Sequence, residues 1–240
     1  MKLSILMPVY NERKFIREVI RRVISADTGK FEKEIIIVDD GSSDGTADIL
    51  SEILKRYNGN NAKKHKGVNV KVIFHKNNGG KSMAIRTALA NATGEYCIVQ
   101  DADLEYRPEE IIILLRELVK RKANAVYGTR FSGKHNPKYR FLYFGNKMLT
   151  MITNIMYFSS ITDMETGYKL VRTSILKKMK LKAEGFGMEP EITAKLLKKG
   201  VKIYEVPINY VCRDYEEGKK ISWKDGIKAA LYLLKFRIMN

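Results

Sequence analysis

Short apolar runs alternate with segments of helical periodicity through the first half of the chain. The continuous runs predict buried strands at Leu3–Pro8, Glu34–Val38, Val70–Phe74, Tyr96–Gln100 and Ala125–Gly128. Between the first two strands, one helix face is marked by Phe15, Ile16, Val19, Ile20 and Val23. Alternating strands and helices are typical of a mostly parallel sheet flanked by helices, so we predict an α/β fold.

Turn and capping residues indicate where further helices begin. The acidic stretch Asp39–Gly45 predicts a turn into a helix, and a second glycine-rich break precedes a predicted helix at Lys81–Asn91. Pro108 suits the first turn of another helix, whose positive end Glu109 and Glu110 would complement.

The pattern weakens after Arg130, where two amphipathic helices are expected. The first carries an apolar stripe of Met148, Met151, Ile152, Ile155 and Met156, with Thr150, Thr153 and Asn154 on the other face. The second carries Trp223, Ile227, Ala230, Leu231 and Leu234, interleaved with Lys224, Lys228, Lys235 and Arg237. Such stripes lie on a membrane surface or, more often, pack on the domain core, and we expect the packing. We predict one domain with a C-terminal elaboration.

The formal net charge of +17 changes this picture by pointing to a polyanionic partner. Nucleic acid, an acidic membrane face and phosphorylated small molecules all fit, while a lysine-rich solvated surface is the alternative explanation.

Cysteine content and hydropathy bear on the compartment. The two cysteines, Cys97 and Cys212, are too few for a disulfide framework. The sequence shows no signal-peptide pattern and no run of ~20 apolar residues. We therefore expect a cytoplasmic protein, unless a partner carries it to a membrane.

Polar clusters follow three of the predicted strands. They are Tyr10–Glu12, Asp39–Asp40 and Asp101–Asp103. Because parallel strands end at one edge of a sheet, and ligands bind there, we expect these clusters to share one crevice. Several carboxylates in one crevice repel one another unless a cation or hydrogen-bond donors compensate them.

The segment Asp101–Glu105 suits a hard divalent cation, since Mg²⁺ takes a few carboxylates and completes its shell with waters and phosphates. No His or Cys stands beside Asp103, which argues against zinc. Asp40 is remote from this segment and suits nucleoside recognition instead. Alternatively, Asp39 or Asp44 only caps the next helix.

Two common phosphate-binding motifs are absent. The chain lacks Gly-x-Gly-x-x-Gly, which disfavours a dinucleotide oxidoreductase, and lacks a complete P-loop. Lys81 nevertheless stands at a predicted helix N-terminus, where it would meet phosphate.

Together these motifs resemble the family 2 glycosyltransferases, and within them the dolichyl- or polyprenyl-phosphate sugar synthases. The matching segments, in family order, are Ser4–Arg13, Ile36–Thr46, Asn78–Arg86, Gln100–Glu105, Gly128–Phe131, Thr162–Lys169, Gly187–Lys195 and Glu217–Gly226. The resemblance implies a GT-A fold, with a Rossmann-like, mostly parallel sheet. It also implies a nucleotide-binding half at about residues 1–130 and an acceptor-binding half at about 131–240.

The resemblance also implies a role for each matching residue. The nucleoside would be held by Pro8, Tyr10, Glu12, Val38 and Asp40, and the donor by Ala102 as well. Mg²⁺ or Mn²⁺ would be held on the diphosphate by Asp101, Asp103 and Glu105, where the family often has Gln at the last place. Arg130 and Arg140 would meet an acceptor phosphate, while Arg213 with Lys219 or Lys220 would close over the donor.

The resulting hypothesis is an inverting hexosyltransferase that uses a GDP- or UDP-linked sugar, with mannose or glucose transferred to a dolichyl or polyprenyl phosphate. A hydroxyl acceptor in glycan or cell-envelope synthesis is the alternative, and it would need a general base. Glu189, Glu191 and Asp163 are the candidates for that base, although the two glutamates also suit a helix start.

Two other classes remain as rivals. A sugar-phosphate nucleotidyltransferase would need a glycine-rich signature after the first strand, and Pro8–Asn11 does not match it. A nucleic-acid-binding module would need aromatic residues among Lys and Arg, for which Tyr139–Phe144 is a modest candidate. We expect no nucleic-acid partner.

Overall fold

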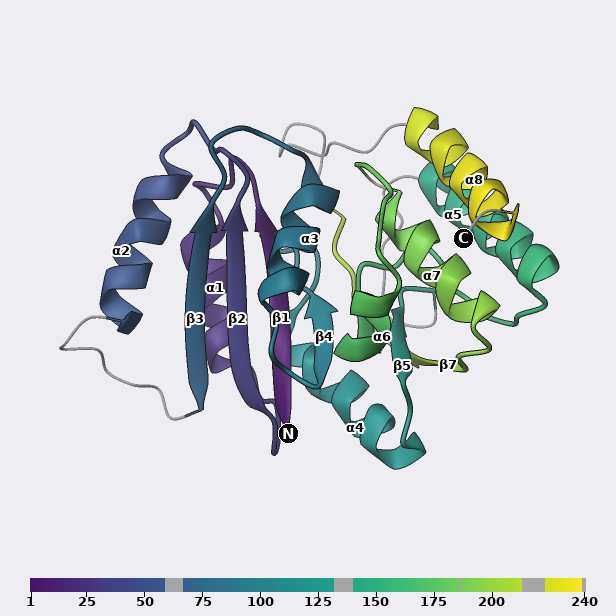
Figure 1. Ribbon diagram of the computed structural model, residues 1–240, viewed down its shortest axis with the longest axis horizontal. Coiled ribbons are helices and arrows are strands. Elements are labelled where there is room, and N and C mark those ends of the chain that lie inside the picture. The colour runs from purple at the N-terminus through teal and green to yellow at the C-terminus, as the bar shows by residue number, and fades with distance from the viewer. Residues whose placement is uncertain (59–66, 132–139, 186, 213–222, 239–240) are drawn as a thin grey trace.

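The structure is a computed structural model that describes residues 1–58, 67–131, 140–185, 187–212 and 223–238 (Figure 1). Its strands are β1 (Lys2–Val9), β2 (Glu32–Asp39), β3 (Val68–Phe74), β4 (Tyr96–Val99), β5 (Ala125–Thr129), β6 (Lys169–Arg172) and β7 (Ile203–Pro207). Its helices are α1 (Ile16–Ser25), α2 (Thr46–Asn58), α3 (Lys81–Asn91), the 3₁₀ turn η1 (Pro108–Glu110), α4 (Ile111–Arg121), α5 (Arg140–Tyr157), α6 (Thr173–Lys178), α7 (Met188–Lys198) and α8 (Trp223–Ile238).

The strands of the described part form one sheet in the order β3-β2-β1-β4-β6-β5-β7. Strand β6 runs antiparallel to both of its neighbours, and the other pairs are parallel. Leu6 of β1 pairs with Ile36 of β2 and with Val99 of β4, so the three strands end at one edge. The predicted α/β fold with a mostly parallel sheet is confirmed.

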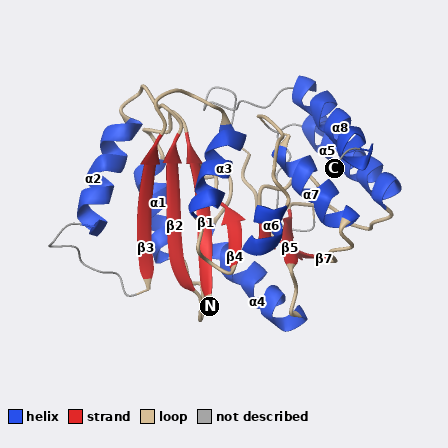
Figure 2. Cartoon of the chain, viewed as in Figure 1, coloured by secondary structure: helices blue, strands red, loops and turns tan. Residues whose placement is uncertain are grey.

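Strand residues alternate between the two faces of the sheet, and each face has its own helices. In β2, Ile35 and Ile37 pack with residues of α1, α2 and α4, while Ile36 and Val38 pack with residues of α3, α6 and α7. Figure 2 shows the helices on both sides of the strands. The sheet is therefore buried on both faces, as expected for strands with continuous apolar runs.

The predicted strands and the helix at Lys81–Asn91 agree with the structure to within about two residues at each end. The helix predicted to begin at Pro108 starts there as a 3₁₀ turn. Its two acidic residues bind other segments: Glu109 pairs with Arg22 at 2.7 Å, and Glu110 accepts a hydrogen bond from the Asn209 amide.

Helices α5 and α8 meet one expectation only in part. Their apolar stripes were expected to pack on the core, and Ile152, Met156 and Ala230 do so. Ile227, Leu231 and Leu234 of α8 are exposed, however, and so are Met148, Met151 and Ile155 of α5. Its predicted polar face points inward instead, because Thr150 and Thr153 are buried. These two hydroxyls donate to backbone carbonyls one turn earlier, which removes the cost of burying them. No described helix is long and apolar enough to cross a membrane.

Candidate active site

The polar clusters converge at the edge where β1, β2 and β4 end. Asp39 is the last residue of β2, and Asp101 follows β4. Lys81 opens α3, which follows β3, and Glu189 lies in the first turn of α7. Four elements that are distant in sequence therefore bring charged side chains to this edge.

Lys81 connects two of these carboxylates. Its Nζ lies 2.9 Å from Asp101 Oδ1 and 3.3 Å from Glu189 Oε1. Burial alone would lower the pKa of Lys81, but the charges of Asp101 and Glu189 outweigh burial and raise it. Lys81 is thus a permanent cation that offsets the negative charge of the site.

The predicted metal ligands form a looser arrangement. Asp103 Oδ1 accepts a hydrogen bond from the Glu105 amide at 3.0 Å, and Glu105 Oε2 accepts one from the Tyr210 hydroxyl at 2.7 Å. Among the described residues, no three His, Cys, Asp or Glu side chains form a group that could hold a metal ion. Asp101 and Asp103 offer only oxygen donors, which fits a hard cation that takes its remaining ligands from water and phosphate.

Asp40 organises a loop of the protein itself. Its carboxylate accepts hydrogen bonds from the Gly79 and Gly80 amides, the shortest at 2.7 Å, and contacts His75 Nδ1 at 2.7 Å. Gly80 has a φ of 83°, which glycine adopts without strain. The carboxylate predicted to bind the nucleoside therefore fixes the turn that positions Lys81.

The neighbouring carboxylate, Asp39, still has an open hydrogen-bond acceptor. Its Oδ2 accepts a hydrogen bond from the Ser42 amide at 3.2 Å, whereas the buried Oδ1 has no hydrogen-bond partner. The capping role considered for this cluster falls to Asp44, which accepts from the amide and hydroxyl of Thr46 at the start of α2. Sequence reasoning put the ligand on Asp40, but geometry leaves an open acceptor on Asp39.

The loop after β1 is pinned against the same segment. Asn11 adopts a φ of 55° and exchanges hydrogen bonds with the Ser42–Ser43 turn. The Glu12 amide donates to the Thr46 hydroxyl at 3.1 Å, while the Tyr10 side chain is partly exposed beside it. Hydrogen bonding thus fixes the loop that contains Tyr10 and Glu12 next to Asp39.

Pro8 and Val38 stand opposite each other in the register of β1 and β2. Both are buried, and the Val38 side chain packs with α3. Ala102 is buried as well, among the residues of the opposite face. These three residues support the edge of the sheet from within.

Arg130 follows β5 and is bound to Asp163. Its Nε and Nη2 each lie 2.8 Å from an oxygen of the Asp163 carboxylate, and its amide donates to the same group. Burial would raise the pKa of Asp163, but the Arg130 guanidinium lowers it further than burial raises it. The pair holds the guanidinium in one orientation, with three of its five N–H groups directed elsewhere.

Of the three acids considered as a base, only Glu189 borders the site. Asp163 is bound to Arg130, and the fully buried Glu191 accepts from the Lys182 and Ala183 amides and from Lys195. Glu189 Oε2 is buried without a hydrogen-bond partner. Both glutamates lie in the first turn of α7, as the helix-start alternative expects, and the contacts of Glu191 already occupy its carboxylate.

Glu165 was missed by sequence reasoning. Its Oε1 is buried without a hydrogen-bond partner, and burial together with the Glu189 charge raises the pKa of Glu165 to about 7. Nearby Lys169 donates to the carbonyls of Met164 and Thr166, and burial lowers its pKa. The only signal for this group in the sequence was its place within the Thr162–Lys169 segment, which matches the family.

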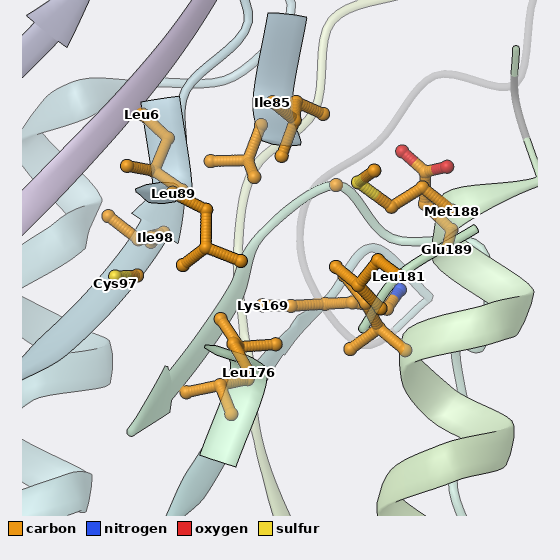
Figure 3. A pocket seen from close by; sticks show the side chains of 14 residues that line it. Leu6, Ile85, Leu89, Cys97, Ile98, Lys169, Leu176, Leu181, Met188 and Glu189 are labelled. Carbon is orange, nitrogen blue, oxygen red and sulfur yellow. The ribbon is translucent and has the colours of Figure 1, made fainter. Parts of the chain in front are cut away.

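An apolar pocket lies behind these charges, between the sheet and helices α3, α6 and α7 (Figure 3). Leu6, Leu89 and Ile98 form one side of it, Leu181 and Met188 the other. Glu189 and Lys169 are the charged side chains in its wall. Apolar surroundings of this kind disfavour a charged ammonium group, which explains the lowered pKa of Lys169.

Four predicted residues lie wholly or partly outside the described chain. Arg213, Lys219 and Lys220 fall in the 213–222 segment, which the structure does not describe. Arg140 opens α5, but its side chain is likewise outside the description. Their assignments stay predictions.

Comparison with known proteins agrees with this geometry. Residues 4–180 match the family described as glycosyl transferase family 2. An uncharacterised protein of Methanocaldococcus jannaschii is 33% identical over 96% of this chain and 97% of its own length. A dolichol-phosphate mannosyltransferase of Pyrococcus furiosus is 30% identical over 91% of this chain, which spans 59% of that relative. A dolichyl-phosphate β-glucosyltransferase of Trichomonas vaginalis is 27% identical over 99% of this chain and 73% of its own length.

Solved structures share the fold at lower identity. Glucosyl-3-phosphoglycerate synthase from Mycobacterium tuberculosis, with Mn²⁺, UDP and phosphoglyceric acid, superposes with a TM-score of 0.70 at 17% identity. The match covers 100% of this chain and 79% of the synthase. A mannosyltransferase from Pyrobaculum calidifontis, with GDP-mannose and Mn²⁺, gives 0.62 at 19% identity, over 88% of this chain and 56% of its own. The chain has the GT-A fold and belongs to glycosyl transferase family 2.

Proposed function

We propose that this chain transfers mannose or glucose from a GDP- or UDP-linked donor to a dolichyl or polyprenyl phosphate, with inversion at the anomeric carbon. One observation carries the proposal. In the described part of the chain, the buried side-chain polar atoms without a hydrogen-bond partner are Asp39 Oδ1, Glu165 Oε1 and Glu189 Oε2. Asp39 ends β2, and the charges of Glu165 and Glu189 interact with each other. Buried polar atoms are normally paired, so these open carboxylate acceptors suit a ligand rich in N–H and O–H donors.

A nucleotide sugar supplies such donors. Asp39 Oδ1 suits a base N–H or a ribose hydroxyl, and the fixed loop of Tyr10 and Glu12 borders it. Glu165 and Glu189 suit the hydroxyls of the sugar. Asp40 acts indirectly, because its bonds to Gly79 and Gly80 set the start of α3 and thereby the place of Lys81.

The diphosphate would lie between Lys81 and the Asp101–Asp103 segment. These carboxylates fit Mg²⁺ or Mn²⁺, with Glu105 beside them. A divalent cation held there supplies a Lewis acid that offsets the charge developing on the leaving nucleoside diphosphate. Lys81 and the first turn of α3 contribute positive potential to the same phosphates.

In the transfer step, an acceptor oxygen forms a bond to the anomeric carbon while the bond from that carbon to the diphosphate oxygen breaks. A lipid phosphate is already anionic and requires no base. Arg130, oriented by Asp163, would hold that phosphate, with Arg140 as a second contact. The names of the Pyrococcus furiosus and Trichomonas vaginalis relatives support a dolichyl-phosphate acceptor.

A hydroxyl acceptor is the second candidate. Glu189 favours it, since its buried Oε2 is free of hydrogen bonds and lies in the wall of the site. In that reaction Glu189 would accept the proton of the attacking hydroxyl.

Labelled GDP-mannose and UDP-glucose distinguish the two when each is incubated with Mn²⁺ and either polyprenyl phosphate or soluble saccharides. We expect the label in the organic phase with the lipid acceptor. Label found only in soluble saccharides would overturn the lipid-phosphate assignment. A lipid acceptor would place the protein at a membrane surface, and its two free cysteines favour the cytoplasmic face.

A further inference from the structure

Two exposed apolar stripes follow the outer faces of α5 and α8. Both repeat at helical spacing: Phe144, Met148, Met151 and Ile155 on α5, and Ile227, Leu231, Leu234 and Ile238 on α8. Ile155 is 67% exposed and Leu231 58%, while Phe158, which follows α5, is 89% exposed. Soluble surfaces rarely carry aligned apolar side chains of this size without a partner.

The inner faces of the same helices already have their packing partners. Leu149 and Tyr157 of α5 are buried with Leu233 and Phe236 of α8, and α7 completes this cluster. The Tyr157 hydroxyl donates to the Leu233 carbonyl at 2.7 Å and fixes one helix against the other. The outer stripes are therefore a second apolar face on helices whose first face is in the core.

The position of α5 and α8 and the charges beside their apolar stripes indicate which kind of partner fits them. Figure 1 shows α5 and α8 side by side at the end of the molecule opposite α2. Lys228, Lys235 and Arg237 are exposed on α8, and Lys147 lies on α5. The only acidic residue in the sequences of these two helices is Asp225. Basic side chains beside an apolar stripe match a surface that is apolar inside and anionic outside.

We propose that the outer faces of α5 and α8 dock the protein in the plane of an anionic lipid bilayer. The apolar stripes would enter the acyl boundary, while the lysines extend toward the headgroups. A second copy of the chain fits less well, because two such faces would bring basic residues against basic residues. This inference goes beyond the proposed function, since vesicle binding depends on neither the sugar nor the acceptor.

Vesicle flotation tests the proposal. Wild-type protein should float with vesicles of phosphatidylcholine mixed with an equal amount of phosphatidylglycerol, and much less with phosphatidylcholine alone. Added salt should release it, since salt screens the basic residues. Leu231→Gln with Leu234→Gln should lower the partition coefficient roughly tenfold or more. Lys228→Gln with Lys235→Gln should lower it roughly tenfold to thirtyfold on the anionic vesicles.

Matched controls lie outside α5 and α8. Ile113→Gln with Val119→Gln removes two exposed apolar side chains of α4, and Lys14→Gln with Lys120→Gln removes two exposed charges. Both controls should float like wild type. Every variant should keep the wild-type melting temperature and donor affinity, which separates a failure of docking from a failure of the proposed function.

Three results would overturn the docking face. The first is wild-type protein that stays with the unbound fraction on anionic vesicles, and the second is stripe variants that float as wild type does. The third is a wild-type dimer in sedimentation velocity that the stripe variants convert to monomer, because this would assign the face to a second copy.

Discussion

Lys81 Nζ lies 2.9 Å from Asp101 Oδ1, which joins the start of α3 to the end of β4. Glu189 contacts the same ammonium at 3.3 Å, so the first turn of α7 is bound to this point as well. One cation thus fixes three elements that the sequence separates by up to about a hundred residues. Its position offsets the carboxylates, and we propose as its second task that it meets the donor diphosphate.

Replacing Lys81 with Met should separate these tasks from packing, since Met keeps the length of the side chain without its charge. Donor affinity should fall roughly tenfold to a hundredfold, the usual effect of losing a hydrogen bond to a charged group. Isothermal titration with GDP-mannose and UDP-glucose measures this. Lys71→Met, which removes an exposed lysine of β3, is the control and should bind as wild type does. Unchanged affinity in Lys81→Met would contradict the diphosphate assignment.

Glu165→Gln should make the protein more stable and less active. The pKa of Glu165 is raised to about 7 in the folded state, so folded protein holds this proton more tightly than unfolded protein does. Stability therefore falls as pH rises from about 4.5 to about 7, and the neutral Gln avoids that loss. Urea unfolding should show a gain of about 1–3 kcal/mol at pH 8 that disappears below about pH 4.5. A variant that gains stability and keeps full activity would remove Glu165 from the sugar site.

The Arg130–Asp163 pair predicts the opposite pH dependence. Asp163→Asn leaves a buried guanidinium without its carboxylate and should cost about 3 kcal/mol of unfolding free energy at neutral pH. The pKa of Asp163 is lowered in the folded state, so the wild-type advantage should be complete above about pH 4–5. It should shrink as the pH falls through that range and below. An advantage that stays constant down to pH 2–3 would show that the charge of Asp163 contributes nothing.

Asp39 and Asp44 offer a test within a single loop. Asp39→Asn keeps an acceptor for the Ser42 amide but removes the charge, and should weaken nucleotide binding roughly tenfold or more. Asp44→Ala removes the cap of α2 and should instead cost about 1 kcal/mol of stability with little change in nucleotide affinity. Thermal unfolding and titration with GDP and UDP record both effects. If Asp39→Asn lowered only stability and Asp44→Ala lowered nucleotide affinity, the nucleoside contact would be assigned to Asp40 or its neighbours instead.

The first half of the fold could be predicted because its signals are local. Continuous apolar runs such as Ile35–Val38 belong to strands buried on both faces, and the glycines before Lys81 interrupt the chain at the start of α3. Strand β6 gave no such signal. It has four residues, begins with the buried Lys169 and pairs antiparallel with β4 and β5, which only tertiary contacts determine.

The sequence predicts which charged residues meet at the site, but not which contacts each of them makes. Strand ends indicated Asp101 and the Asp39–Asp40 pair, since position along a parallel sheet is enough to bring them together. Which carboxylate of the pair is open depends on the loop at Gly79–Gly80, more than thirty residues away, which closes over Asp40. The prediction of which face of helix α5 is buried was wrong for a related reason. Thr150 and Thr153 satisfy their hydroxyls within the helix and can therefore face the core.

Asp103→Asn tests the central claim most directly. Asn keeps the acceptor for the Glu105 amide and the shape of the turn, and removes only the charge that a divalent cation requires. Transfer of labelled sugar from GDP-mannose or UDP-glucose to polyprenyl phosphate, with Mn²⁺ present, should be clear for wild type and fall by at least about a hundredfold in the variant. Melting temperature should not change. A variant that transfers sugar as fast as wild type would contradict the account of this site.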